Sequence, residues 1–210
     1  MARNKKTAAR AWTRLDNAAK IFPPSNMGTN TSVFRFSCTL KEMVQPELLQ
    51  QALDKAVEKF PAYLVVMKSG AFWYYFEETG QKPKVVPETR AVCGPLWEEG
   101  SRELLFEVSW FKERINLEMF HALTDGTGAV AFLKTIVYYY LLAAHPDGFG
   151  ETPPVLPEEA SEAARSSDSF RKYYKPVHGK KGKKGGPRAW NIRGQGAGRE
   201  DLLIMEGVAP

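Results

Sequence analysis

Hydrophobic residues between about 31 and 146 follow two periods, and each period predicts one kind of element. Every second residue is apolar over 34–40, which is typical of one face of a strand. Apolar residues recur at helical spacing over 48–60, behind a proline that suits a first helical turn, and again over 129–141. The chain therefore combines strands with two helices that each bury an apolar side.

Four more apolar segments form pairs that predict two β-hairpins. Residues 63–67 and 72–76 flank a Lys-Ser-Gly-Ala turn, and residues 104–110 and 114–120 make the second pair. The order β-α-β-β-β-β-α predicts an α/β chain of the α+β kind, with a mixed, largely antiparallel sheet and helices packed on one face. Because helices do not alternate with strands, and because no GxGxxG or P-loop string occurs, the pattern argues against a dinucleotide-binding fold.

The chain divides into a periodic part and a connection. Residues 1–150 form the predicted folded lobe, which opens with a short strand and a loop over 12–30. Residues 151–210 form an extended connection that starts rich in Pro, Glu and Ser and continues into a basic, Gly- and Lys-rich segment. This connection has the composition of a linker that starts a crossover to a second folded unit.

Charge is concentrated in that connection. The net charge is +5, yet residues 171–199 hold ten basic residues and no acidic one, so the rest of the chain is acidic overall. We interpret the segment first as a solvated linker, with a phosphate-attracting arm or non-specific contact with nucleic acid as alternatives. A specific nucleic-acid domain is not expected, because such domains spread their charge over a folded face.

Composition limits which class of protein this can be and in which cellular compartment we expect it. With 210 residues, 43% hydrophobic and 25% charged, the chain is not wholly disordered. The apolar stretch over 129–144 contains a lysine and three tyrosines, which argues against a membrane span, and no secretory signal is evident. Cys38 and Cys93 lack metal-ligand spacing, as do the three histidines, so we expect reduced thiols, a cytoplasmic location and no metal.

One string carries the chemistry of interest, where the last strand meets the second long helix. Residues 119–128 read M-F-H-A-L-T-D-G-T-G. In the structural interpretation, Asp125 or Thr127 caps the helix, Gly126 relieves a tight turn and His121 is a polar residue ending a strand. In the functional interpretation, His121 is a general base held by a rigid turn, because histidine titrates near neutral pH.

The H-x-x-x-D-G string at a strand-to-helix junction resembles the signature of the chloramphenicol-acetyltransferase-like superfamily. That superfamily includes condensation domains, plant acyltransferases with an HxxxD motif and alcohol acetyltransferases. Further strings add to the likeness: R-L-D-N-A at 14–18, F-R-F-S at 34–37, K-F-P at 59–61 and F-W-Y-Y at 72–75. Together they are similar to the N-terminal half of bacterial alcohol-acetyltransferase-like proteins.

The resemblance implies a role for each matching residue. His121 would be the catalytic base that deprotonates an acceptor so that it attacks an acyl thioester, with acetyl-CoA as cosubstrate and no bound cofactor. Asp125 would be structural, through an arginine ion pair for which Arg14 is the candidate. Gly126 would leave the reaction tunnel open. Phe120 stands where condensation domains usually double the histidine, which favours a small alcohol as acceptor over peptide-bond formation.

The position of the motif implies that the chain corresponds to one lobe. His121 lies where two-lobe members of the superfamily end their first lobe, and the second lobe normally supplies the other tunnel wall. Activity would then require a second-lobe protein or self-association. The alternatives are one half of a split enzyme, or a non-catalytic remnant or interaction module that keeps the lobe fold.

Overall fold

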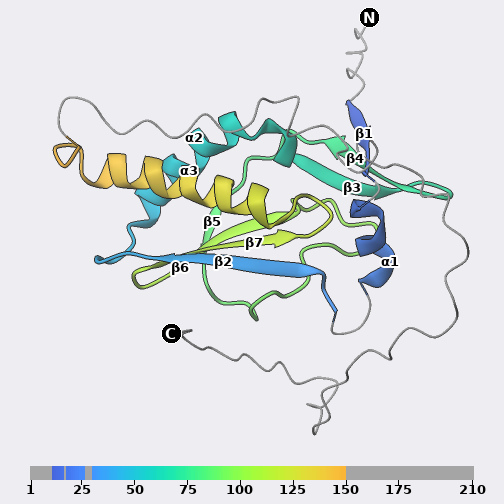
Figure 1. Ribbon diagram of the computed structural model, residues 1–210, viewed down its shortest axis with the longest axis horizontal. Helices are drawn as coiled ribbons and strands as arrows, with labels where there is room; N and C mark the ends of the chain where they lie inside the picture. Colours follow the sequence, from blue (N-terminus) through green and yellow to red (C-terminus); the bar gives the residue numbers. More distant parts are fainter. Residues whose placement is uncertain (1–10, 17, 27–29, 150–210) are drawn as a thin grey trace, which may run out of the picture. The chain divides into compact units, whose positions relative to one another are not determined.

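The computed structural model describes residues 11–16, 18–26 and 30–149, and the predicted connection 151–210 lies outside them. The elements that it contains are, in chain order, β1 (Trp12–Arg14), η1 (Ala19–Ile21), α1 (Phe22–Ser25), β2 (Val33–Thr39), α2 (Pro46–Lys59), η2 (Pro61–Tyr63), β3 (Val65–Ser69), β4 (Tyr74–Glu78), β5 (Val85–Pro87), β6 (Phe106–Phe111), β7 (Arg114–Phe120) and α3 (Gly126–Ala144) (Figure 1).

The strands form two sheets where the sequence pattern predicted one. The larger sheet has the order β2-β7-β6-β5; its β2–β7 and β6–β7 pairs are antiparallel and its β5–β6 pair is parallel. The smaller sheet has the order β1-β4-β3 and is antiparallel throughout. The predicted α+β class with a mixed, largely antiparallel sheet arrangement is confirmed, whereas the single sheet is wrong.

Two short parts of the structure were not predicted from the hydrophobic pattern. Strand β5 has three residues and ends in a proline, which is too short for a period of two to be visible. The predicted loop after β1 contains η1 and α1, where Pro23 and Pro24 occupy the first turn of α1. Proline is tolerated there because the first helical N–H groups have no intrahelical partner.

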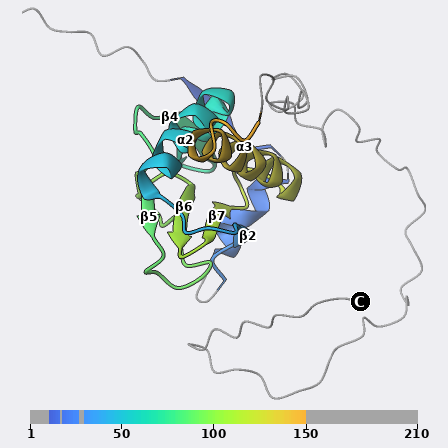
Figure 2. The same cartoon turned by 90° about the vertical axis from the view of Figure 1, so that its left-hand side faces the viewer.

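Helices α2 and α3 cover one face of the larger sheet, as predicted (Figure 2). Leu53 from α2 and Ile136 from α3 are fully buried together with Leu117 of β7. Within the described residues, α3 is long and apolar enough by length and composition to cross a membrane. In this structure its buried side packs against α2 and the larger sheet.

A second hydrophobic cluster lies beneath the smaller sheet. Met67 of β3 and Phe120 at the end of β7 are buried in it, and Trp97, from the segment between β5 and β6, packs on Phe120 with ring centroids 5.8 Å apart. The end of β7 therefore lies between the two clusters. The packing of Phe120 therefore fixes the backbone position from which the next residue, His121, starts.

The face of the larger sheet opposite the helices carries a network of paired charges. Arg35 pairs with Glu88 and with Glu118, its Nη2 atom lying 2.8 Å from the latter carboxylate. Arg114 contacts Glu88 at 2.8 Å, and the fully buried Asn116 donates to the same carboxylate at 3.1 Å. Burial alone would raise the pKa of Glu88, but the hydrogen bonds from the two arginines outweigh it and hold that pKa below its ordinary value.

Candidate functional site

His121 follows strand β7 directly and is held at its backbone. The strand ends at Phe120, the last residue of the predicted span 114–120, so His121 is the first residue of the turn. Its backbone N–H donates to Ser32 O at 2.8 Å, just ahead of β2. The residue as a whole is half-buried.

Two phenylalanines surround the imidazole. Phe22 from α1 is stacked on it, with ring centroids 4.3 Å apart and the planes within 12° of parallel. Phe34 from β2 meets it at 4.9 Å with planes inclined by 61°. In the described part of the chain, no hydrogen bond or ion pair engages an imidazole nitrogen of His121. Among the described residues, aromatic contacts hold the ring.

The turn after His121 is braced by hydrogen bonds. Asp125 is the N-cap of α3, and its Oδ1 atom accepts a hydrogen bond from Gly128 N at 2.9 Å. Tyr63 donates its hydroxyl proton to Thr124 Oγ1 at 3.1 Å, which ties the turn to η2. Of the two cap candidates in the sequence, the structure has Asp125.

The glycines of the motif differ in what they make room for. A Cβ added at Gly128 would lie 2.8 Å from Tyr63 Oη and closer still to Thr124 Oγ1, so the brace leaves no space for a side chain. A Cβ added at Gly126 would make an ordinary contact with Phe36 at 3.6 Å. Packing therefore demands glycine at 128, whereas at 126 it leaves a small free space beside Phe36.

Arg14 and Asp125 are not brought together. Arg14 is exposed on β1, at the edge of the smaller sheet, and lies opposite Tyr75 in the strand register. Asp125 caps a helix that packs on the larger sheet, and among the described residues its side chain bonds Gly128 and no arginine. The expected ion pair is corrected accordingly, because the two residues belong to different parts of the fold.

Sequence reasoning missed Phe22 as a contact of His121. The string K-I-F-P-P read as the start of a loop, and only the fold shows that its phenylalanine lies on the imidazole. The contact between Thr124 and Tyr63 could not be predicted either, because their hydrogen bond joins two segments that are separated in the chain by five strands. The proline pair beside Phe22 was the one local signal that a helical turn could start there.

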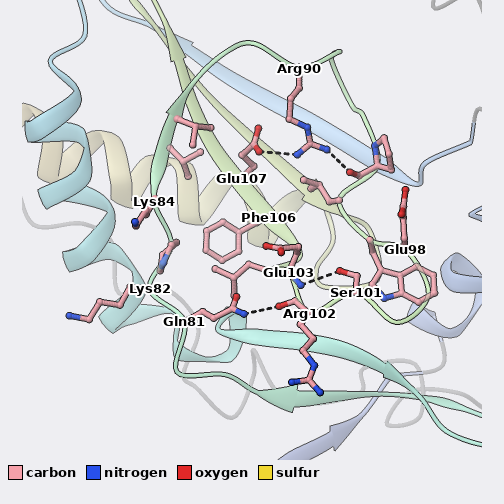
Figure 3. A pocket seen from close by; sticks show the side chains of 17 residues that line it. Gln81, Lys82, Lys84, Arg90, Glu98, Ser101, Arg102, Glu103, Phe106 and Glu107 are labelled. Carbon is pink, nitrogen blue, oxygen red and sulfur yellow. Dashed lines mark hydrogen bonds and ion pairs between the residues drawn. The ribbon is translucent and has the colours of Figure 1, made fainter.

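A cavity of about 590 Å³ lies away from this site, between the segments that precede and follow β5 (Figure 3). Phe106 lies at its floor, and Arg90 pairs with Glu107 at 3.0 Å on one side. Gln81 donates to Arg102 O at 2.8 Å on the other side. His121 does not line this cavity, and among the described residues no group of three or more His, Cys, Asp or Glu side chains could hold a metal ion.

Comparison with known proteins finds likeness in structure alone. No family model matches the chain, and no curated protein matches it by sequence. A variant of the starter condensation domain of rhizomide synthetase RzmA, in complex with C8-CoA, matches with a TM-score of 0.59 and 12% identity over 77% of this chain and 42% of its own.

Two further structures agree. The unsubstituted RzmA starter condensation domain has a TM-score of 0.55 and 12% identity, covering 78% of this chain and 44% of that one. SgcC5 from Streptomyces globisporus has a TM-score of 0.50 and 14% identity, covering 70% and 39%. These likenesses show a shared fold. The chain spans about two-fifths of the length of the structures that it matches.

Proposed function

We propose that the chain is an acyltransferase-like lobe in which His121 is the general base. The observation that carries the proposal is the imidazole at the β7–α3 junction, held between Phe22 and Phe34 with both nitrogens free of other described residues. Histidine suits proton transfer near neutral pH. The fold shared with a condensation domain that was crystallised with an acyl-CoA supports the same reaction class.

The proposed reaction moves an acyl group from sulfur to oxygen. An imidazole nitrogen accepts the proton of an acceptor hydroxyl as the oxygen attacks the thioester carbonyl carbon and forms a C–O bond. Collapse of the tetrahedral intermediate breaks the C–S bond. The departing thiolate takes the proton back from the imidazolium, so the products are an ester and a free thiol, and His121 returns to its starting state.

The cosubstrate that we propose is an acyl-CoA, with acetyl-CoA as the first to test and a small alcohol as acceptor. The RzmA complex contains C8-CoA, which supports an acyl thioester without fixing the acyl length. Phe120, buried in the second hydrophobic cluster, stands where condensation domains usually carry another histidine, which favours a hydroxyl acceptor and a likeness to alcohol acetyltransferases. We place the protein in the cytoplasm, where acyl-CoA is available.

A second candidate is a lobe that is inactive by itself. The observation favouring it is that the chain spans about two-fifths of the structures with its fold. A second-lobe protein or a second copy would then supply the rest of the tunnel, which is the split-enzyme case. A remnant or interaction module would keep the fold without turnover.

The test is release of free thiol from acetyl-CoA and octanoyl-CoA with a panel of alcohols, by the chain alone and with a second-lobe partner. We expect His121→Ala to lower the rate about 10²–10⁴-fold, the usual contribution of a positioned base. His145→Ala is the matched control, because that half-exposed histidine lies at the far end of α3. Turnover that survives His121→Ala would contradict the assignment, and absence of turnover in every combination would favour the inactive lobe.

A further inference from the structure

We propose that Phe22 is a positioning residue for the imidazole of His121, which makes the short helix α1 part of the site. Its consequence for catalysis rests on the proposed function, whereas its structural content does not. No comparison assigns a role to α1, whose Phe22 packs against the second hydrophobic cluster and stacks on this imidazole.

The need for such a residue follows from the contacts of the imidazole. The χ2 torsion of histidine is broad, so a ring without hydrogen bonds is oriented by packing alone. No described residue bonds the nitrogens of His121, and the stacked ring of Phe22 covers one face at 4.3 Å. Phe34 contacts the imidazole with its ring plane inclined by 61°, so it restricts the ring from another side. Together the two phenylalanines restrict the orientation of the imidazole ring.

Helix α1 is anchored well enough to hold Phe22 in place. Asn26 N donates to Phe22 O at 3.0 Å and closes the helix, and the Asn26 side chain donates to Trp97 O at 3.0 Å. Trp97 in turn packs on Phe120, the residue before His121. The stacked pair is therefore connected through α1, Trp97 and Phe120, and the buried Pro23 fixes the helix against the core.

This arrangement differs from the usual way of orienting a catalytic histidine. In the serine-protease triad, a carboxylate bonds one ring nitrogen and fixes the tautomer and the orientation. Here ring contacts orient the imidazole, and no residue that the structure describes bonds either nitrogen. Removing the ring of Phe22 should therefore release the imidazole without removing any hydrogen bond.

The test uses NMR on the full chain at a pH of about 8, where free histidine is neutral. A stacked phenyl ring shifts the imidazole protons upfield by its ring current, and His121→Ala assigns the His121 signals. We expect an upfield displacement in the wild type relative to the half-exposed His145. It should be largely lost in Phe22→Leu, which keeps an apolar side chain, and kept in Phe22→Tyr.

Phe111→Leu is the control, since that phenylalanine is 49% exposed at the β6–β7 turn. A nuclear Overhauser effect between the Phe22 ring and the His121 imidazole in the wild type provides a measurement that needs no variant to fold. Absence of that effect, or a displacement unchanged in Phe22→Leu, would overturn the proposal.

Kinetics separate this inference from the proposed function. In an active preparation we expect Phe22→Leu to lower kcat up to about 10²-fold, the cost of a misplaced catalytic group, with KM for the thioester little changed and Phe22→Tyr restoring the rate. A displaced NMR signal without any turnover would support positioning while contradicting acyl transfer. Full turnover by Phe22→Leu would overturn positioning.

Discussion

Asp125 caps helix α3 through a hydrogen bond from Gly128 N while its carboxylate stays exposed. The likeness to acyltransferases suggested a second role, an ion pair with arginine, which the exposed Arg14 does not fill. The cap alone still serves the site, because it fixes the end of the turn that begins at His121. The Tyr63–Thr124 hydrogen bond braces the same turn from outside.

We therefore expect Asp125→Ala to cost about 1 kcal/mol of unfolding free energy, the usual value of a lost N-cap. Breaking a buried ion pair would cost about 3–5 kcal/mol instead. Asp125→Asn should retain most of the stability, and Arg14→Ala should change it little. Denaturant titration of the three variants decides the matter: a large loss in both Asp125→Ala and Arg14→Ala, with a non-additive double variant, would restore the ion pair.

Among the helices and strands, the long and regular ones could be predicted from the hydrophobic period of the sequence. Strand β7 and helix α3 are long and regular, so their apolar spacing located them and the motif between them. Strand β5 could not be predicted because three residues show no period of two, and α1 could not because four residues show no helical period. The stacking of Phe22 on His121 depends on α1, so that contact could not be predicted from the sequence.

The network of paired charges on the larger sheet makes the stability of the fold depend on pH. The pKa of Glu88 is held below its ordinary value of 4.5, so its pairing stabilises the fold above that pH and is lost as pH falls through the folded-state pKa. We expect Glu88→Gln to lower the unfolding free energy by roughly 1–3 kcal/mol at neutral pH, because it weakens the pairing of two arginines. The difference from wild type should shrink as the pH falls below about 4.5.

Chemical denaturation of wild type and Glu88→Gln from neutral to acidic pH measures this. Glu107→Gln is the matched control, because its partner Arg90 is half-exposed and such pairs contribute about 0–1 kcal/mol. A wild-type advantage over Glu88→Gln that persists unchanged in acid would contradict the role assigned to Glu88.

At the scale of the whole molecule, the described lobe leaves aromatic surface uncovered. Phe72 is 93% exposed at the β3–β4 turn, and the adjacent Trp73 is 57% exposed. Trp12 on the neighbouring β1 is also 57% exposed and touches Tyr75 edge-on. Contiguous exposed apolar patches often mark interaction sites. The exposed aromatic side chains at the smaller sheet are therefore candidates for contact with another molecule.

The basic segment 171–199 lies outside the described residues. Within those residues, both hydrophobic clusters are built between Leu15 and Ala144. Because the segment combines like charges with glycine, it offers little apolar surface to such clusters. We expect deletion of Lys180 to Gly198 to leave the thermal midpoint nearly unchanged, as followed by circular dichroism.

A matched deletion inside the folded lobe, of the β3–β4 turn from Gly70 to Trp73, should lower the thermal midpoint, since Gly70 N donates to Trp73 O there. A fall of many degrees on removing the basic segment would instead mean that it packs on the lobe and is more than a linker.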